Sequence, residues 1–513
     1  MVNLPPALKP LVAVKTFESL QAQAGASNMK RDLDAKDVVL IGIGEIIGAG
    51  IFVITGTAAA KFAGPAIVLS FVIAGITCAF AGLCYSEMAA CVPISGSAYT
   101  YAYATIGELG AWIFRFDGRV PRWCRNCAVG WSAYLCSFIE TITGTELSPA
   151  FTNGALSYTD EKGFYRDESN GFVNLPAMAV VIACTVALCF GVKHSAWVNH
   201  TLCAVKLAVI FLFLFATVGY IDPKNWSPFI PGPDADGTYG IQGVFRASTS
   251  VFFAYIGFDA VSTTAQEVKN PARDMPIGIM GSLGFCTVIY ILVSGTLTGI
   301  SPYKLLKTAA PLSDTVKRLG LGWLSTLVSI GAISGLTSVI LVSLMAQPRI
   351  FYAMAYDGLL PPVFGKINKK YGTPVIQTVI SGTICALMAG FFPIDVLGDL
   401  TSAGTLFAFA LVSLSVGVLR FTRPDIERPF KVPLGPVIIP ALGFICSMGL
   451  VINTGGATVL RLIIWMAFGL VIYALYGRRH SVLRTGKSIE GLAKAEDFGG
   501  HGEHKASDGK EVA

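Results

Sequence analysis

Charged residues are scarce in this sequence. Asp, Glu, Lys and Arg make up 14% of its 513 residues, whereas a soluble globular domain has about a quarter. Hydrophobic residues make up 53%, and long uncharged blocks recur from end to end. This pattern excludes an ordinary soluble protein and predicts an all-α polytopic membrane protein surrounded by lipid. The net charge of +6 is small for this length, so no nucleic-acid partner is expected.

The sequence also lacks a pattern of cysteines that would hold a metal or a disulfide framework. Most of its 12 cysteines are scattered through apolar blocks, and the close pair Cys124 and Cys127 has no partner pair. We therefore interpret them as small buried hydrophobic residues and expect neither a metal nor another resident cofactor. No nucleophile–base constellation stands out either, so an enzyme is not expected.

About twelve apolar stretches are long enough to cross a bilayer as helices. They fall near 38–60, 65–91, 109–138, 174–192, 197–220, 244–266, 277–300, 322–355, 375–392, 394–420, 434–454 and 457–477. With the N-terminus inside, most Lys and Arg residues of the loops lie on the cytoplasmic side. The positive-inside rule therefore predicts a multi-pass protein of a plasma or inner membrane with both termini in the cytoplasm.

The two ends of the chain are polar. Residues 1–37 contain no short cleavable signal and are expected to form a cytoplasmic tail. Residues 38–478 form the predicted transmembrane domain. Residues 479–513 are Gly-rich and charged, so a disordered cytoplasmic tail is expected there.

Two of the predicted spans are interrupted near their middles. The first has four glycines at its centre, each of which costs a helix about 0.5–1 kcal/mol relative to alanine. These glycines are Gly42, Gly44, Gly48 and Gly50. The sixth span contains the run FAYIGFD at 253–259. Close helix packing would explain one such cluster. Paired interruptions in spans of opposite direction instead indicate a transporter binding site.

Three of the ionisable residues inside predicted spans are candidates for the site. Lys206 is about 15 Å deep in the fifth span, where burial favours the neutral amine, so we predict a proton-coupling role. The alternative is a charged lysine that hydrogen-bonds helix carbonyls. Asp259 follows the sixth-span interruption and could cap the helix or act as a titratable gate. Glu45, beside the first interruption, could pair with Lys206, bind a cation or pack protonated.

The third predicted span contains an unusual block, IFRFDGRVPRWCRN, at 113–126. Its four arginines follow one helical stripe, as in a voltage sensor, and each would cost about 2.5–3.5 kcal/mol at the bilayer centre. These arginines are Arg115, Arg119, Arg122 and Arg125. Gly118 and Pro121 argue against an orderly sensing helix. We predict a distorted third span and hypothesise a frameshifted remnant or a sequencing error.

Several stretches together resemble one family. They include GIGEIIGAGIFVITG in the first span, FFAYIGFDAVSTTAQEVKNPARDMPIGI across the sixth, and SGLTSVILVSLMAQPRIFYAMAYDGLLPPVFGKI further on. With others they cover roughly residues 35–475. On these motifs the chain resembles the amino acid–polyamine–organocation superfamily, and within it the cationic amino acid transporter family in its twelve-span form.

The resemblance implies a LeuT-like 5+5 inverted repeat with discontinuous helices 1 and 6. Repeat one would span 38–220 and repeat two 244–420, with two extra helices in 434–477. It further implies an amino acid substrate whose backbone lies between the two broken helices.

The resemblance also assigns roles to residues. The substrate carboxylate would meet amides around Gly48, Ala49 and Gly50, and its ammonium would meet carbonyls near Ile46, Phe253 and Ile256, with the Phe253 ring as a gate. The expected substrate-binding set is Ile46, Ile47, Gly48, Ala49, Gly50, Phe253, Ala254 and Ile256. Lys206 falls on the lysine that replaces a sodium ion in proton-coupled relatives.

Three departures from the family accompany this resemblance. Glu45 stands where a small residue is usual, Ala49 where Ser or Thr is frequent, and the third span lacks its expected glutamate. We expect a proton-coupled amino acid importer that works by alternating access, with cationic or broad selectivity. The alternative is a non-transporting amino acid sensor, or an inactive transporter with a damaged third span. Oligomeric state is not readable.

Overall fold

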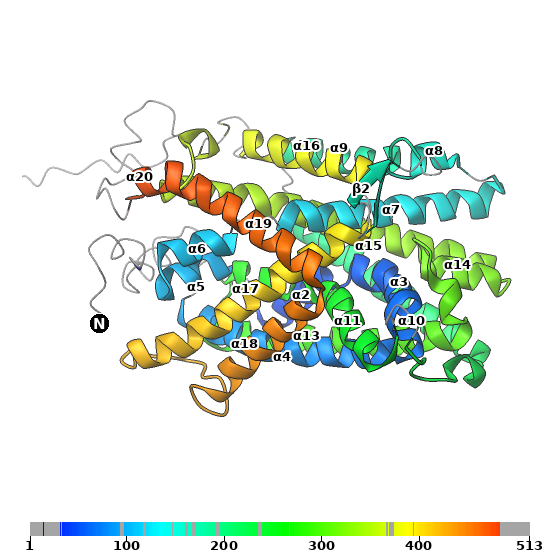
Figure 1. Cartoon of the computed structure of the whole chain (residues 1–513), viewed down its shortest axis with the longest axis horizontal. Coiled ribbons are helices and arrows are strands. Elements are labelled where there is room, and N and C mark those ends of the chain that lie inside the picture. Colours follow the sequence, from blue (N-terminus) through cyan, green and yellow to red (C-terminus); the bar gives the residue numbers. More distant parts are fainter. Residues whose placement is uncertain are drawn as a thin grey trace, which may run out of the picture.

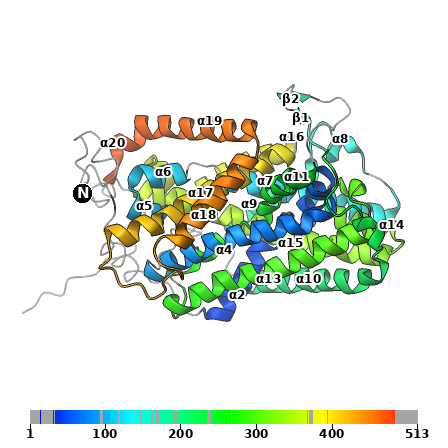
Figure 2. The ribbon, with the colours of Figure 1, turned by 60° about the horizontal axis from the view of Figure 1, so that its bottom comes forward.

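The structure is a computed structural model in which the chain is predominantly helical. It describes residues 14, 31, 33–92, 97–115, 119–145, 147–159, 163–166, 171–190, 195–233, 239–265, 267–365, 368, 374–392 and 394–482. Within these residues one small antiparallel sheet joins β1 (Leu156–Thr159) to β2 (Gly163–Arg166). Figure 1 and Figure 2 show most long helices running side by side along the long axis of the molecule.

Each predicted span coincides with a helix or an interrupted helix. The uninterrupted ones are α4 (Ile67–Cys91), α9 (Leu175–Phe190), α10 (Ser195–Thr217), α13 (Pro271–Ile300), α15 (Gly322–Tyr356), α16 (Val375–Phe391), α17 (Ile394–Thr422), α18 (Ile438–Asn453) and α19 (Gly456–Ile472). Among the described residues, six stretches are long and apolar enough to cross a membrane, and α9, α16 and α18 are shorter apolar helices. The prediction of a polytopic helical membrane protein is confirmed.

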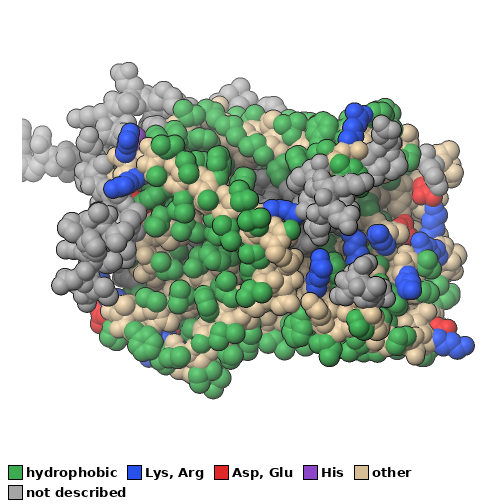
Figure 3. All heavy atoms as spheres, in the orientation of Figure 1, with side chains coloured by type: hydrophobic (Ala, Val, Ile, Leu, Met, Phe, Trp, Pro, Cys, Tyr) green, Lys and Arg blue, Asp and Glu red, His purple; other side chains and the backbone are tan. Residues whose placement is uncertain are grey.

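Polar elements gather at the two ends of the helices. Figure 1 and Figure 2 place α5 (Ser97–Thr105), α6 (Glu108–Arg115) and α20 (Arg478–His480) at one end. The opposite end holds α8 (Pro149–Thr152), α14 (Pro311–Arg318) and the sheet. Figure 3 shows hydrophobic side chains over most of one face, with lysines and arginines gathered toward the α14 end. Such a surface suits helices that are surrounded by lipid.

The first span is a broken helix. Its opening helix α2 (Ala35–Ile46) begins with a capping box in which Asp34 and Asp37 exchange side-chain and backbone hydrogen bonds. The Asp37 amide, above all, holds the pKa of the exposed Asp34 carboxyl below its ordinary value. The α-helix ends at Ile46, and after a short bend a π-helical turn, η2 (Gly50–Ile54), resumes the path.

The first span then continues through two further short helices. They are α3 (Thr55–Ala58) and the π-helical η3 (Ala59–Ala63). The first predicted interruption therefore coincides with a real break in the α-helix.

The sixth span is broken in the same way. The helix α11 (Gly240–Phe252) passes into a 3₁₀ turn, η7 (Phe253–Tyr255), and a short helix, α12 (Phe258–Val261), follows. Between them Gly257 has a φ of +128°, which a residue with a side chain rarely adopts. The glycine in FAYIGFD therefore permits the turn that separates the two helical pieces.

The third span is described in two pieces on either side of residues 116–118. They are α6, up to Arg115, and α7 (Arg119–Thr143). Backbone atoms of 116–118 and side chains of 114–123 lie outside the described residues, so the predictions for Arg115, Arg119 and Arg122 cannot be compared with the structure. Arg125 is buried, and it donates to Asn126 Oδ1 at 2.8 Å and to the Phe392 carbonyl.

From Cys124 onward, however, α7 is a packed helix. The Trp131 indole donates to Thr337 of α15 at 2.9 Å, and the Tyr134 hydroxyl donates to the Phe52 carbonyl in η2. The part of the third span beside the broken first span is therefore firmly held.

The end of the described chain is anchored to the molecule. Ser481 is buried and its hydroxyl donates to the buried carboxylate of Glu108, which also accepts from Tyr473 at 2.7 Å. The Val482 amide donates to the Asp357 carbonyl at 3.1 Å. The first four residues of the predicted tail, 479–482, are thus described and held in place.

Candidate functional site

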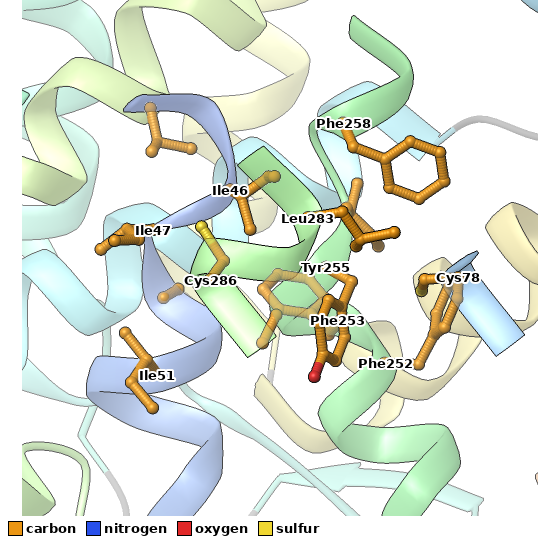
Figure 4. Packing of buried hydrophobic residues seen from close by; sticks show 14 of the residues in the cluster. Ile46, Ile47, Ile51, Cys78, Phe252, Phe253, Tyr255, Phe258, Leu283 and Cys286 are labelled. Carbon is orange, nitrogen blue, oxygen red and sulfur yellow. The ribbon is translucent and has the colours of Figure 1, made fainter. Parts of the chain in front are cut away.

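The two helix interruptions touch each other in the core. Figure 4 shows Ile46, Ile47 and Ile51 along the first interrupted helix and Phe253 and Tyr255 along the second. A Cβ atom added to Gly50 would lie only 2.1 Å from the Cα atom of Ala254. Glycine is therefore required at position 50 because the two backbones meet there.

Lys206 supplies hydrogen-bond donors to the first interruption. Its side chain is fully buried at the middle of α10, and its ammonium donates to the carbonyls of Gly44 and Ile47, the latter at 3.0 Å. A longer contact of 3.5 Å reaches Ser338 Oγ on α15. The last carbonyls of a helix have no partner within it, and here a lysine satisfies two of them.

A tyrosine that the sequence analysis did not single out joins both interruptions. The hydroxyl of Tyr290, on α13, lies 2.8 Å from the carbonyl oxygen of Ile46 and 2.8 Å from that of Ala254. Its ring is buried in the core. The only signal in the sequence was a hydroxyl inside an apolar span, where a buried phenol needs a partner.

The start of η2 places backbone amides beside α7. The Tyr134 hydroxyl of α7 donates to the Phe52 carbonyl within this turn. A Cβ on Gly48 would lie 3.1 Å from a methyl group of Val339 on α15, a tight contact but a less severe one than at Gly50. Amides at the first turn of a helix attract anions, so this turn can receive a carboxylate.

The carbonyls of the second interruption differ from the expected set. The Phe253 carbonyl accepts from the Ile256 amide at 3.3 Å, so it is used within the 3₁₀ turn. The Ala254 carbonyl instead reaches across to Tyr290. The amide of Gly257 donates to Asp259 Oδ1 at 3.3 Å, which agrees with the capping alternative for this aspartate.

Glu45 is buried beside the second interruption. A Cβ on Gly257 would lie 3.0 Å from the Glu45 carbonyl oxygen, so the backbones are close there too. The carboxyl group of Glu45 interacts electrostatically with Lys206 and Asp259, but among the described residues it forms no ion pair with Lys206. Within that same part of the chain, no group of three or more His, Cys, Asp or Glu side chains is placed to hold a metal ion.

A second buried charge cluster lies at the end of α4. The carboxylate of Glu87 accepts two hydrogen bonds from Arg420 of α17, one of them at 2.9 Å, and a third from the Val432 amide at 2.8 Å. The Nε atom of Arg428 lies 3.5 Å from Oε1 of Glu87. Glu87 and Arg420 are 333 residues apart, so their pairing could not be predicted from the sequence.

Comparison with known proteins matches most of the chain to one family. The family described as "Amino acid permease" matches residues 33–474. The methylthioribose transporter of Bacillus subtilis is 41% identical over 472 residues, which cover 91% of this chain and 98% of that protein.

Two further relatives are named for other substrates. The branched-chain amino acid permease BcaP of Bacillus subtilis is 43% identical over 469 residues, covering 90% of this chain and 97% of that protein. The vacuolar cationic amino acid transporter 2 of Arabidopsis thaliana is 36% identical over 448 residues, which cover 86% of this chain and 67% of that protein.

Proposed function

The chain belongs to the amino acid permease family and is a multi-pass amino acid transporter, and we propose that it couples uptake to protons by alternating access. The observation that carries the proposal is the meeting of the two helix interruptions at Gly50 and Ala254. Freed amides of one helix and freed carbonyls of the other are thereby brought to one place in the core.

The arrangement we propose is the inverted repeat with two extra helices. Repeat one covers 38–220, repeat two covers 244–420, and the extra helices lie in 434–477. The interruptions at corresponding places, in the first and sixth spans, support this assignment. We place the protein in the plasma membrane with both termini in the cytoplasm. In support, Leu33 pairs with the segment after the sixth span, exchanging backbone hydrogen bonds with Glu267 and Lys269.

In this proposal the substrate backbone binds between the interruptions. The carboxylate takes the amides at Gly48, Ala49 and Gly50, where the start of η2 favours an anion. The ammonium takes carbonyls of Ile46 and Ala254. Both ends of a zwitterion would therefore be matched by backbone groups, which leaves selectivity to the surrounding side chains.

The proton acts through Lys206. As an ammonium, this side chain has three N–H donors, and the structure places three acceptors around it. A neutral amine has only two, so loss of the proton would leave one of these acceptors, a carbonyl of the first interruption or Ser338 Oγ, without its donor. The backbone amides that bind the substrate carboxylate in this proposal follow within one turn. Proton loss would therefore weaken substrate binding.

The test is uptake of radiolabelled leucine and arginine into proteoliposomes. Leucine represents the branched-chain substrates of one relative and arginine the cationic substrates of another. Accumulation that requires an inward proton gradient would support the proposal. Saturable binding without accumulation would favour the sensor, and a lack of both would favour an inactive protein. Inhibition by unlabelled methylthioribose would extend the range of substrates.

A further inference from the structure

The hydroxyl of Tyr290 makes a contact that its burial alone does not explain. It lies 2.8 Å from the Ile46 carbonyl and 2.8 Å from the Ala254 carbonyl. A phenol carries one proton, so it can donate to only one of these oxygens at a time. Two acceptors from two different broken helices therefore converge on a single donor.

A neighbouring tyrosine shows the ordinary arrangement. The hydroxyl of Tyr255 donates to the Phe71 carbonyl in the uninterrupted helix α4, at 2.9 Å. The two tyrosine rings pack against each other with centroids 5.3 Å apart, and Tyr290 also packs against Phe71 at 5.4 Å. The rings thus share one environment, whereas only the Tyr290 hydroxyl bonds to the two helix interruptions.

We propose that Tyr290 is a positioning residue whose hydroxyl joins the two broken helices and competes with the substrate ammonium for their carbonyls. This inference rests on the proposed function. An ammonium has three donors and can satisfy both carbonyls at once, which the phenol cannot. Substrate binding therefore displaces the hydroxyl, and substrate release lets it return.

The competition has a consequence for the transport cycle. In the carrier without substrate, the hydroxyl keeps buried carbonyls hydrogen-bonded, and a buried carbonyl without a donor is costly. Net uptake requires the carrier without substrate to change back from its inward-facing to its outward-facing state. Exchange of internal for external substrate does not require that step. The Tyr290 hydroxyl therefore assists net uptake but not exchange.

The experiment compares Tyr290→Phe with Tyr255→Phe, because each removes one hydroxyl from the same pair of rings. Whichever of leucine and arginine the wild-type protein takes up best serves as the labelled probe. In Tyr290→Phe we expect its affinity to rise by about tenfold, the effect of one buried hydrogen bond, and net uptake to fall by a similar factor. Exchange should stay unchanged, and Tyr255→Phe, which keeps both contacts of the Tyr290 hydroxyl, should not show this combination of tighter binding and lower net uptake.

The outcomes separate this inference from the proposed function. If the wild-type protein accumulates the probe only with an inward proton gradient, the proposed function holds whatever Tyr290→Phe does. Weaker binding with equal losses of exchange and net uptake would overturn the inference, as would a Tyr290→Phe protein that behaves like wild type. If Tyr290→Phe does not fold, a difluorinated tyrosine at this position keeps the ring and donates more strongly, so it should weaken probe binding. Unchanged or tighter binding would then overturn the inference.

Discussion

Gly50 and Gly48 are both glycines of the first interruption, yet their surroundings differ. A Cβ at Gly50 would lie 2.1 Å from the Ala254 backbone, and one at Gly48 would lie 3.1 Å from the end of the Val339 side chain. Gly50→Ala should abolish substrate binding because the two backbones would have to separate. Gly48→Ala should lose about 1–3 kcal/mol of binding or stability, the usual cost of overpacking.

Both variants can be purified and tested with the same labelled amino acid. The leucine variants Gly48→Leu and Gly50→Leu should both lose substrate binding while the protein still inserts into the membrane. Equal, near wild-type affinities in Gly48→Ala and Gly50→Ala would show that the substrate does not bind between these segments.

Lys206 allows a second prediction at the residue scale. Lys206→Ala removes the titratable group and the donors to the Gly44 and Ile47 carbonyls. Transport should lose its dependence on external pH, and substrate should only equilibrate across the membrane rather than accumulate. Binding should weaken less than uptake. Arginine at the same position, which keeps a charge but does not titrate, is the matched control.

Uptake measured against a stepwise pH gradient checks this role. Persistent pH-driven accumulation by Lys206→Ala would leave the lysine as a structural donor only, which was the alternative stated from the sequence.

Single residues also show how far the sequence could reveal the site. Lys206 and Gly50 stood out because a charge or a glycine is unusual in an apolar helix. Tyr290 did not, because tyrosine is common in buried spans and its carbonyl partners come from segments 244 and 36 residues away. The Ala254 carbonyl was likewise not singled out for hydrogen bonding, since the position of the 3₁₀ turn decides which carbonyl is free.

At the scale of elements, the ion pair between Glu87 and Arg420 joins α4 to α17. Glu87 is almost fully buried and accepts from Arg420 and from the Val432 amide in the segment before α18. Glu87→Gln should destabilise the protein by up to about 3 kcal/mol, because it leaves the partly buried guanidinium of Arg420 without its counter-charge. The double variant Glu87→Gln with Arg420→Met should recover part of that loss.

Thermal unfolding in detergent measures both variants. A Glu87→Gln protein as stable as wild type would mean that the three segments are held together by apolar packing instead.

The third span gives a prediction of the same scale. Arg125 is buried within α7, where the polytopic pattern calls for an apolar residue. If the block is a remnant of another reading frame, Arg125→Leu should be tolerated or should raise the thermal midpoint, since well-packed apolar residues often replace buried charges without loss. A large loss of stability or binding would assign the arginine a structural or functional role.

The elements were predictable to different degrees. The spans and both interruptions followed from apolar length and from the glycine clusters. The small helices α5, α8, α14 and α20 lie in polar loops and were not foreseen, because their positions depend on what they pack against. For the third span, distortion was predicted only for the arginine-rich block, whose residues 116–118 lie outside the described residues, and the packed contacts of Trp131 and Tyr134 lie beyond that block.

For the whole molecule, the same limits apply to the ends of the chain. Composition assigned 479–513 to a disordered tail, since that stretch is polar throughout. Composition could not reveal that Ser481 meets the buried carboxylate of Glu108, because that acid lies 373 residues earlier. Removing residues 483–513 should therefore leave thermal stability unchanged. Removing 478–513 should lower the free energy of unfolding by about 1–3 kcal/mol, because the buried Glu108 carboxylate loses the hydrogen bond from Ser481.

The anchored segment that ends at Val482 also determines what can be joined to it. A reporter or a binding domain fused after Val482 would start from one defined point, beside the backbone of Asp357. Distances measured from such a label to the opposite end of the helices would then report rearrangements of the transporter itself.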